Sequence, residues 1–132
     1  MKTLPDLTTG QKSYDNGMDS VVIRRYTGGI PGGRTLDMTD FQDEVIRAGH
    51  IVIKDTETGD FKPMPVEGKA YKSLPSKHEY VGVVVASQPK DKPFVAIMNA
   101  GEVNDVAMTY PLTEDIRSAI KTAIPTLIFT HD

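Results

Sequence analysis

The stretch TGGIPGGRT, residues 27–35, has the one spacing in this chain that is typical of enzymatic chemistry. It contains Gly28-x-x-x-x-Gly33-Arg34-Thr35, which differs at one position from the G-x-x-x-x-G-K-[ST] loop that binds nucleotide phosphates. Arg34 stands where that loop has lysine. An arginine binds phosphate well, but its planar guanidinium does not reproduce the compact ammonium group of lysine. The stretch therefore predicts either a variant phosphate loop or a flexible connection.

The remaining sequence favours the flexible connection. A phosphate loop belongs to a parallel sheet whose strands alternate with helices of roughly 10 to 15 residues, and this 132-residue chain has few such helical stretches. Glycine also adopts positive φ angles without steric cost. We therefore interpret four glycines as a hinge: Gly28, Gly29, Gly32 and Gly33.

Other chemically active groups form no recognisable site in the sequence. His50, His78 and His131 are far apart and lack the H-x-x-x-H spacing that would place two imidazoles on one helical face, so we interpret them as ordinary surface histidines. The carboxylates are spread through turns. The absence of cysteine excludes thiolate nucleophiles, disulfides and cysteine-ligated zinc. We expect no catalytic residue, no cofactor and no metal site, in a protein that is not an enzyme.

The composition is that of an ordinary soluble protein, with neither nucleic acid nor membrane as an expected partner. The formal net charge is −3, which gives no electrostatic reason for binding a polyanion or an anionic membrane. The longest apolar run, VGVVVA at residues 81–86, is much shorter than the roughly 18 residues of a membrane span. No apolar signal-peptide region follows Lys2.

The first 26 residues differ from the rest of the chain. They are polar, contain the turn signal Asp15-Asn16-Gly17, and show no sustained period of 3.6 or 2. We predict a flexible N-terminal arm at residues 1–26 and a β-rich domain at residues 27–132, with a short N-terminal hairpin as the alternative to the arm. Four residues near the end of the arm could alternate into a groove on a partner: Val21, Val22, Ile23 and Tyr26.

A short helix and a hairpin are predicted next. The helix would cover Asp40–Ala48 and end at Gly49. The segments HIVIKD and DFKPMPV flank a turn that contains Gly59, as in a β-hairpin. Because Pro63 and Pro65 cannot donate sheet hydrogen bonds, the second strand should lie at an edge or leave the sheet early.

Three further strand-like segments are YVGVVVAS, FVAIMN and EVNDVAM, the last two separated by a predicted turn at Ala100-Gly101. Their short connections favour antiparallel pairing, because parallel strands need long crossovers. A helix is predicted after Thr113, with apolar residues at helical spacing up to Ile124, and Pro125 ends it. Together these elements predict a β-rich α+β fold: a small antiparallel sheet or partly open barrel, with one C-terminal helix and a flexible N-terminal arm.

The final strand-like segment, TLIF, predicts self-association. Both TLIF and VGVVVA present apolar side chains to both faces, whereas one helix covers only one side of a sheet. We therefore expect another copy of the chain to bury three residues: Leu127, Ile128 and Phe129.

The order of these pieces resembles the small head decoration and head fibre proteins of tailed bacteriophages, distantly the lambda-type head decoration proteins. The resemblance covers roughly residues 27–132 and rests on shared order rather than on one diagnostic motif. Its patterns here are Ala48-Gly49, Thr58-Gly59-Asp60-Phe61-Lys62-Pro63, Val81-Gly82-Val83-Val84 and Gly101-Glu102-Val103-Asn104. The ending Ala123-Ile124-Pro125 is similar to the "ALP" ending of that family.

The resemblance implies a structural role without catalysis. A compact domain, typically a homotrimer, would bind the outer face of an expanded phage shell and cement neighbouring copies of the major capsid protein, with an N-terminal arm that orders against the capsid in lambda-type relatives. The protein would be made in the host bacterial cytoplasm and reside on the capsid surface of the virion. Head fibre relatives anchor one end and project the other. A stand-alone β-barrel ligand-binding or interaction module and a nucleotide-binding enzyme are the alternatives.

Overall fold

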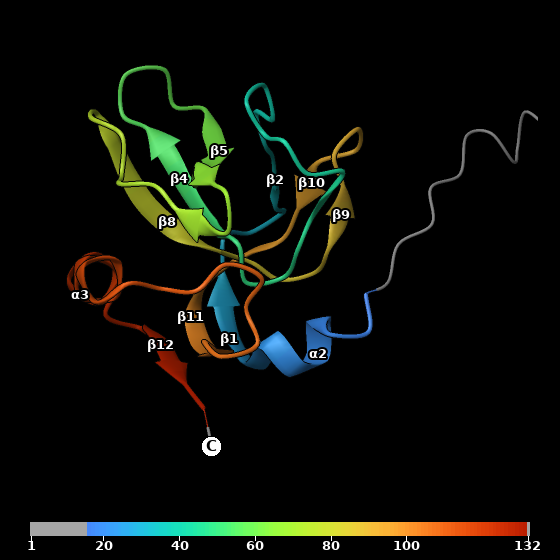
Figure 1. The fold of residues 1–132 in the computed structure, drawn as a ribbon, viewed down its shortest axis with the longest axis vertical. Helices are drawn as coiled ribbons and strands as arrows, with labels where there is room; N and C mark the ends of the chain where they lie inside the picture. The colour runs from blue at the N-terminus through green and yellow to red at the C-terminus, as the bar shows by residue number, and fades with distance from the viewer. Residues whose placement is uncertain (1–15, 132) are drawn as a thin grey trace, which may run out of the picture.

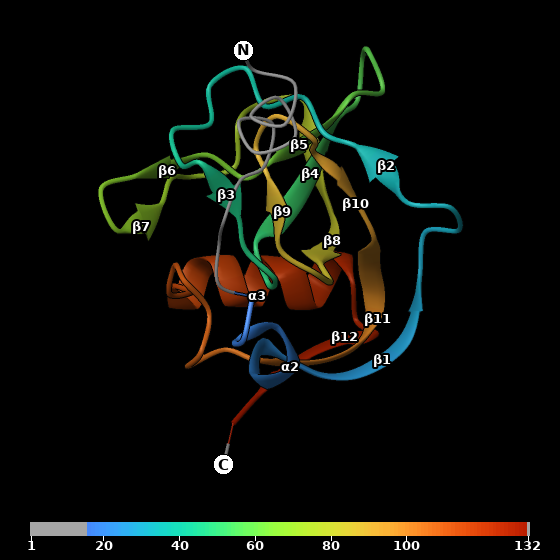
Figure 2. The ribbon, with the colours of Figure 1, turned by 90° about the vertical axis from the view of Figure 1, so that its right-hand side faces the viewer.

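The computed structural model describes residues 16–131, so residues 1–15 of the predicted arm lie outside the described residues. The described chain is β-rich, with a multi-stranded antiparallel sheet, a short helix before the first strand and a longer helix near the C-terminus (Figures 1 and 2). The predicted β-rich α+β class is confirmed.

The central sheet has the strand order β1-β11-β8-β4-β5. The bounds are Ile23–Gly29 for β1, Ile97–Asn104 for β11, His78–Val84 for β8, Ile51–Asp55 for β4 and Phe61–Pro63 for β5. Neighbouring strands along this order are antiparallel, as predicted from the short connections. β1, the first strand in the sequence, thus pairs with β11, a strand from the last third of the sequence.

A further strand, β12 (Leu127–Thr130), lies parallel to β11. β8 pairs with Ile97 and Met98 of β11, whereas β12 pairs with residues 101–104. The two strands thus occupy successive parts of one edge of β11. Parallel neighbours need a long crossover, and the crossover here contains the helix α3 (Glu114–Ala123).

The predicted turn at Ala100-Gly101 is wrong, because β11 continues through it as one strand. The irregularity at this place is a φ angle of 148° at Gly101. A Cβ atom at Gly101 would lie 2.2 Å from the carbonyl oxygen of Arg25 and 2.7 Å from Sδ of Met98. Glycine is needed here because β1 and a core side chain both approach the backbone of β11 closely.

The predicted β4–β5 hairpin is confirmed. Val52 of β4 pairs with Pro63 of β5, and Lys54 pairs with Phe61. Gly59 has a φ angle of 82° in the connecting turn, the left-handed conformation that glycine favours. β5 ends at Pro63 and is the last strand in the sheet order, as the prolines predicted.

The predicted helix at Asp40–Ala48 is wrong. This segment contains turns and bends and one short strand, β3 (Val45–Ile46), which pairs with β9 (Gln88–Pro89). Phe41 and Ile46 are both buried in one core. They are five residues apart, and a helix of 3.6 residues per turn would direct them to different faces, whereas the bends at residues 43–44 reorient the chain between them so that both point inward.

Two short strand pairs complete the fold. β2 (Arg34–Thr35) pairs with β10 (Phe94–Val95), and β6 (Val66–Glu67) pairs with β7 (Ala70–Tyr71). In Figure 1, β2, β9 and β10 stand together on one side, and β4, β5 and β8 stand on the other. The short strands therefore help to enclose the interior rather than extend the central sheet.

The helix α2 (Asp19–Val22) precedes β1, inside the part of the chain predicted as an arm. The carboxylate of Asp19 accepts hydrogen bonds from the N–H (2.8 Å) and the hydroxyl (2.6 Å) of Ser87. Val22 is buried so closely against Gly49 that a Cβ atom there would lie 2.5 Å from Cγ1 of Val22. Residues 19–26 thus belong to the folded domain, which corrects the predicted arm boundary at residue 26.

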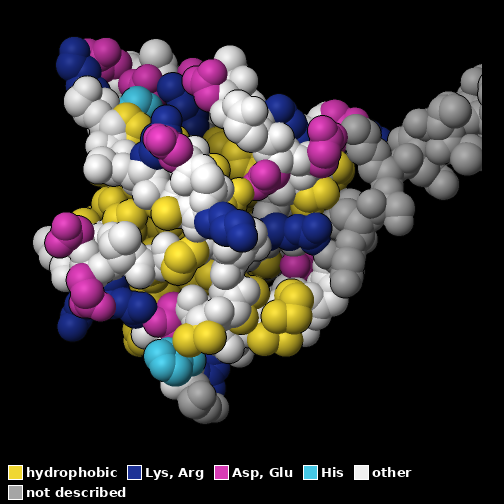
Figure 3. All heavy atoms as spheres, viewed as in Figure 1, with side chains coloured by type: hydrophobic (Ala, Val, Ile, Leu, Met, Phe, Trp, Pro, Cys, Tyr) yellow, Lys and Arg dark blue, Asp and Glu magenta, His cyan; other side chains and the backbone are white. Residues whose placement is uncertain are grey.

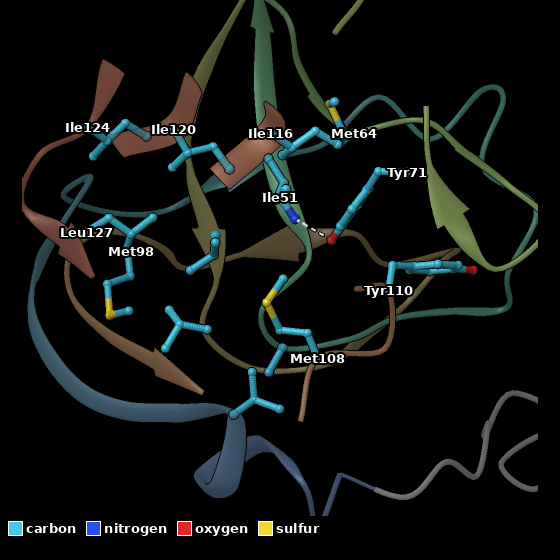
Figure 4. Packing of buried hydrophobic residues seen from close by; sticks show 14 of the residues in the cluster. Ile51, Met64, Tyr71, Met98, Met108, Tyr110, Ile116, Ile120, Ile124 and Leu127 are labelled. Atoms are coloured by element: carbon cyan, nitrogen blue, oxygen red, sulfur yellow. Dashed lines mark hydrogen bonds between the residues drawn. The ribbon is translucent and has the colours of Figure 1, made fainter. Parts of the chain in front are cut away.

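The first core lies between the central sheet and α3 (Figure 4). Ile116 and Ile120 of α3 and its C-cap residue Ile124 are buried in it, which confirms the predicted helix. The hydroxyl of Thr113 accepts a hydrogen bond from the N–H of Ile116 (3.2 Å) and caps the helix. Ile51 of β4 faces this helix and donates its N–H to the hydroxyl of Tyr71. Three methionines fill the same core: Met64, Met98 and Met108.

The second core lies on the other face of β4 and β8. Val52 of β4 and Val84 of β8 are buried in it, whereas Ile53 and Val83 are buried in the first core, as expected from the alternation of side chains along a strand. Ile97 at the start of β11 also belongs to it, and the other members come from the short strands and loops: Leu36, Met38, Phe41, Ile46 and Val95. Both faces of these strands are therefore covered within one chain.

Candidate docking surface

The four glycines interpreted as a hinge fall into two pairs. Gly28 and Gly29 lie in β1, and Gly32 and Gly33 adopt φ angles of 79° and 68° in the turn that follows. Both ends of the stretch pair with one later segment of the chain, because β1 pairs with β11 and β2 pairs with β10. The glycines therefore form a bulged turn that is paired at both ends, and their role as a hinge stays a prediction.

Arg34 does not belong to a phosphate loop. It begins a strand, whereas a phosphate loop leads into a helix whose N-terminal N–H groups bind the anion. Its Nη1 atom donates to the carbonyl oxygens of Gly33 (2.5 Å) and Pro31 (3.1 Å). Its guanidinium also lies over the Phe61 ring, 5.6 Å from the centroid. The arginine thus stabilises its own turn and the neighbouring hairpin.

The four predicted contact residues include exposed and buried side chains. Val21 is 43% exposed and Tyr26 is 55% exposed. Val22 is buried, and Ile23 packs against the first core. Val21 and Tyr26 are therefore available to a partner, whereas Val22 and Ile23 stabilise the fold.

Apolar side chains gather around α2 on the surface. Met18 and Val21 are exposed and three residues apart, so they lie on one side of the helical turn. A cleft of about 260 Å³ separates Met18 from Ala107, and the neighbouring Val106 is 70% exposed. Figure 3 shows hydrophobic side chains over α2 and over the loop between β11 and α3. We call Met18, Val21 and Val106 the α2 patch. The i, i+3 spacing of Met18 and Val21 in MDSVV was the sequence signal for it.

The three self-association candidates also differ in exposure. Leu127 is buried in the first core and Phe129 packs against that core, so both stabilise the domain itself. Ile128 is 52% exposed and pairs with Glu102 of β11, beside Arg25 of β1. The Nε atom of Arg25 lies 3.7 Å from Oε2 of Glu102. We call Arg25, Glu102 and Ile128 the outer sheet face.

The second strand used to predict self-association, VGVVVA, does not support it. Val83 is buried in the first core and Val84 in the second. Both apolar faces of this strand are covered by the same chain, because residues 36–46 and β10 cover the face that α3 does not. The remaining structural basis for self-association is the outer sheet face.

His50 is buried, and its interpretation as a surface histidine is wrong. Its ring packs edge-on against Phe41, Tyr71 and Tyr110, with centroid distances of 5.4, 5.3 and 5.7 Å. The Nε2 atom lies 3.0 Å from the carbonyl oxygen of Met64, to which it donates. Burial lowers the pKa of His50 to about 4, so the ring is neutral near pH 7. In the sequence, His50 directly precedes the apolar run IVI, and this position could have predicted its burial.

A polar cluster joins α3 to the end of β12. The Asp105 carboxylate accepts from Nη2 of Arg117 (2.5 Å) and lies 2.8 Å from Nδ1 of His131. Burial raises the pKa of Asp105, but the hydrogen bonds from Arg117 and His131 outweigh this effect and the net shift is downward. Between residues 16 and 131, no three His, Asp or Glu side chains are grouped so that they could hold a metal ion.

Comparisons with protein-family models, with curated proteins and with solved structures found no match to this chain. No helix in the described part of the chain is long and apolar enough to cross a membrane. The α2 patch and the outer sheet face expose four apolar side chains to solvent: Met18, Val21, Val106 and Ile128.

Proposed function

We propose that the protein is a structural component of a tailed-bacteriophage virion that binds the outer face of the capsid and decorates or cements the head without catalysis. The observation that carries the proposal is the α2 patch, because it exposes Met18, Val21 and Val106 directly beside the point where residues 1–15 join the fold. The resemblance of the sequence patterns between Ala48-Gly49 and Ala123-Ile124-Pro125 to the decoration family also supports the proposal.

A shell protein that covers the α2 patch would remove large apolar side chains from water. Complete burial of such a side chain contributes about 1.5–3 kcal/mol, so a few of them suffice for a modest single-site affinity. The adjoining N-terminal segment could add main-chain hydrogen bonds on the same partner. Several copies acting together would convert modest affinity into lasting attachment.

We further propose that the chain forms a homotrimer, with the outer sheet face at or near the contact between copies. The support is Ile128, an exposed apolar side chain on the edge strand β12. Edge strands that remain open invite pairing, and a closed ring of copies shields them. Sedimentation equilibrium at tens of micromolar tests this point: a clean monomer of 14.5 kDa would restrict any trimer to the capsid.

Cosedimentation with expanded shells of the phage that encodes this chain tests capsid binding. We expect the unmodified protein to pellet with the shells and Val21→Ser to bind at least about 5-fold more weakly, which is the usual effect of removing a side chain that matters at an interface. Phe94→Ser is the matched control, because Phe94 is exposed on β10, away from the α2 patch.

The proposal predicts equal folding of both variants, which the thermal midpoint measures. Failure of the unmodified protein to bind shells would overturn the decoration role. If Val21→Ser binds shells as tightly as the unmodified protein, the capsid contact lies outside the α2 patch.

A further inference from the structure

A cleft of about 280 Å³ lies between residues 37–41, the β4–β5 hairpin and the start of β8, on a different part of the surface from the α2 patch. Segment 37–41 is held against the hairpin by a hydrogen bond from the N–H of Asp37 to the carbonyl oxygen of Phe61 (2.8 Å). Apolar side chains make up most of the lining: Phe41, Ile53, Pro63, Pro65, Val66 and Pro75. Prolines and packed core residues change shape little, so the cleft is a preformed apolar site.

The basic groups of the cleft are already balanced by a carboxylate. Nζ of Lys62 lies 3.8 Å from Oδ2 of Asp55, and Nε2 of His78 lies 3.9 Å from the same oxygen. Nδ1 of His78 is 2.8 Å from the carbonyl oxygen of Ser76, to which it donates, so that Nε2 is the nitrogen that faces Asp55. Lys62 and His78 are thus poor candidates for binding an anion in this cleft.

Two further carboxylates stand at the mouth. The Asp37 carboxylate accepts hydrogen bonds from the hydroxyl and the N–H (3.1 Å) of Thr39. These bonds, and to a smaller extent the charge of Lys62, lower the pKa of Asp37 and keep it ionised. The carboxylate of Asp40 has no hydrogen-bond or ion-pair partner among residues 16–131. Three carboxylates therefore face one lysine and one histidine, and the mouth is negative whether or not His78 carries a proton.

We propose that this cleft binds an alkylammonium or alkylguanidinium group, with the apolar stem on the proline-lined floor and the cation beside Asp37 and Asp40. The volume accommodates one such chain. The same chemistry is found in a lysine or arginine side chain of a protein and in a free aliphatic amine. The inference does not depend on the proposed capsid role, since it concerns another surface.

Amide chemical shifts of the full chain, measured by NMR during titration at neutral pH, test the proposal. The ligands are n-hexylamine, hexan-1-ol and hexanoate, which share the stem and differ in the charge of the head. We expect the amine to shift the amides of Thr39, Phe41 and Lys62 and to bind about 2- to 30-fold more tightly than the alcohol, the range for two exposed ion pairs. Hexanoate should bind most weakly.

A double variant, Asp37→Asn with Asp40→Asn, should reduce the affinity for hexylamine to that for hexanol and leave hexanol binding unchanged. Glu57→Gln is the control for a carboxylate charge lost outside the cleft, because Glu57 lies at the hairpin tip and pairs with Lys77 (3.0 Å). Nα-acetyl-lysine methylamide distinguishes the source: binding at least as tight as that of hexylamine indicates a protein side chain, and weaker binding indicates a free amine.

Equal or tighter binding of hexanoate or hexanol would overturn the proposal, as would amide shifts that do not map to the cleft. If the double variant fails to fold, the relative affinities of the three ligands for the unmodified protein still test the proposal, because the ligands differ in head charge while the protein stays the same.

Discussion

The two faces of β4 and β8 are closed in different ways. On the first, α3 and its C-cap place Ile116, Ile120 and Ile124 in a row over the sheet. On the second, loops and strands of two residues supply one or two side chains each, among them Phe41, Ile46 and Val95. A regular helix covers a face with a repeating pattern, whereas irregular segments cover it residue by residue. The comparison shows that an antiparallel sheet can bury both faces without a second helix.

Shortening a helical residue of the first core should have the largest effect. Ile120 is essentially inaccessible to solvent, so Ile120→Ala should lower the free energy of unfolding by about 2–5 kcal/mol through lost burial and the cavity that remains. Urea unfolding measures the change. Ala119→Ser, on the exposed side of the same helix, is the control and should change stability little. A loss of less than about 1 kcal/mol would mean that α3 is not a tight cover.

Acid should weaken the boundary between the two cores, where His50 contacts Phe41 of the second core and Tyr71 and Tyr110 of the first. The pKa of His50 is lowered from 6.5 to about 4, so between these values the unfolded chain binds a proton that the folded chain does not. The stability that His50 contributes is therefore complete above about pH 6.5 and decreases as the pH falls toward 4, by roughly 3 kcal/mol.

Unfolding free energies at several pH values test this effect against His50→Gln. The variant removes this titration and leaves in place the carboxylate of Asp43, whose charge favours a protonated His50. We expect the unmodified protein to lose stability more steeply than the variant between pH 6.5 and 4. If the unfolding free energies of the two proteins fall equally over this pH range, protonation of His50 does not destabilise the fold.

A smaller effect is expected for Ile46→Val in the second core. Ile46 is fully buried on β3, and removal of one methyl group should cost about 0.5–1.5 kcal/mol. In a double variant with Ile120→Ala, the two losses of unfolding free energy should add, because distant sites in one cooperative unit have additive effects. A double variant that unfolds in two steps by urea titration would show that the cores unfold separately.

The smallest effect on folding is expected for Ile128→Ser. Ile128 lies outside both cores, so its replacement should change the free energy of unfolding by no more than about 0.5 kcal/mol. Sedimentation of the same variant should instead show weaker self-association. If the variant unfolds while remaining associated, Ile128 would have to be reassigned to the interior.

The contrast between the two faces also explains which parts of the fold the sequence predicted. Thr113, the isoleucines of α3 and Pro125 are local signals, and the helix they predict is present. The β4–β5 hairpin follows in the same way from Gly59 and the prolines. The second core lacks such signals, because Phe41 and Ile46 share a core without sharing a period. The helix predicted over them was therefore wrong.

The surface sites were predicted in part, for a related reason. Val21, Tyr26 and Ile128 are exposed, but Val22, Ile23 and Leu127 occupy the interior beside them. Apolar residues that adjoin in sequence can point to opposite sides, and only the tertiary structure decides which side is covered. The mouth of the cleft was not predicted because Asp37 and Lys62 meet through the pairing of segment 37–41 with β5.

The pairing of β1 with β11 has a consequence for how the chain folds as it is synthesised. Ile23 must wait for Val103, its partner in the sheet, to emerge from the ribosome before this part of the sheet can close. The β4–β5 hairpin and the pairing of β4 with β8 can form earlier, since their residues are closer in sequence. Folding is then limited by long-range pairing, which is slow. Until that moment β1 is an unpaired strand, and a nascent chain of this protein is most exposed to aggregation just before synthesis reaches β11.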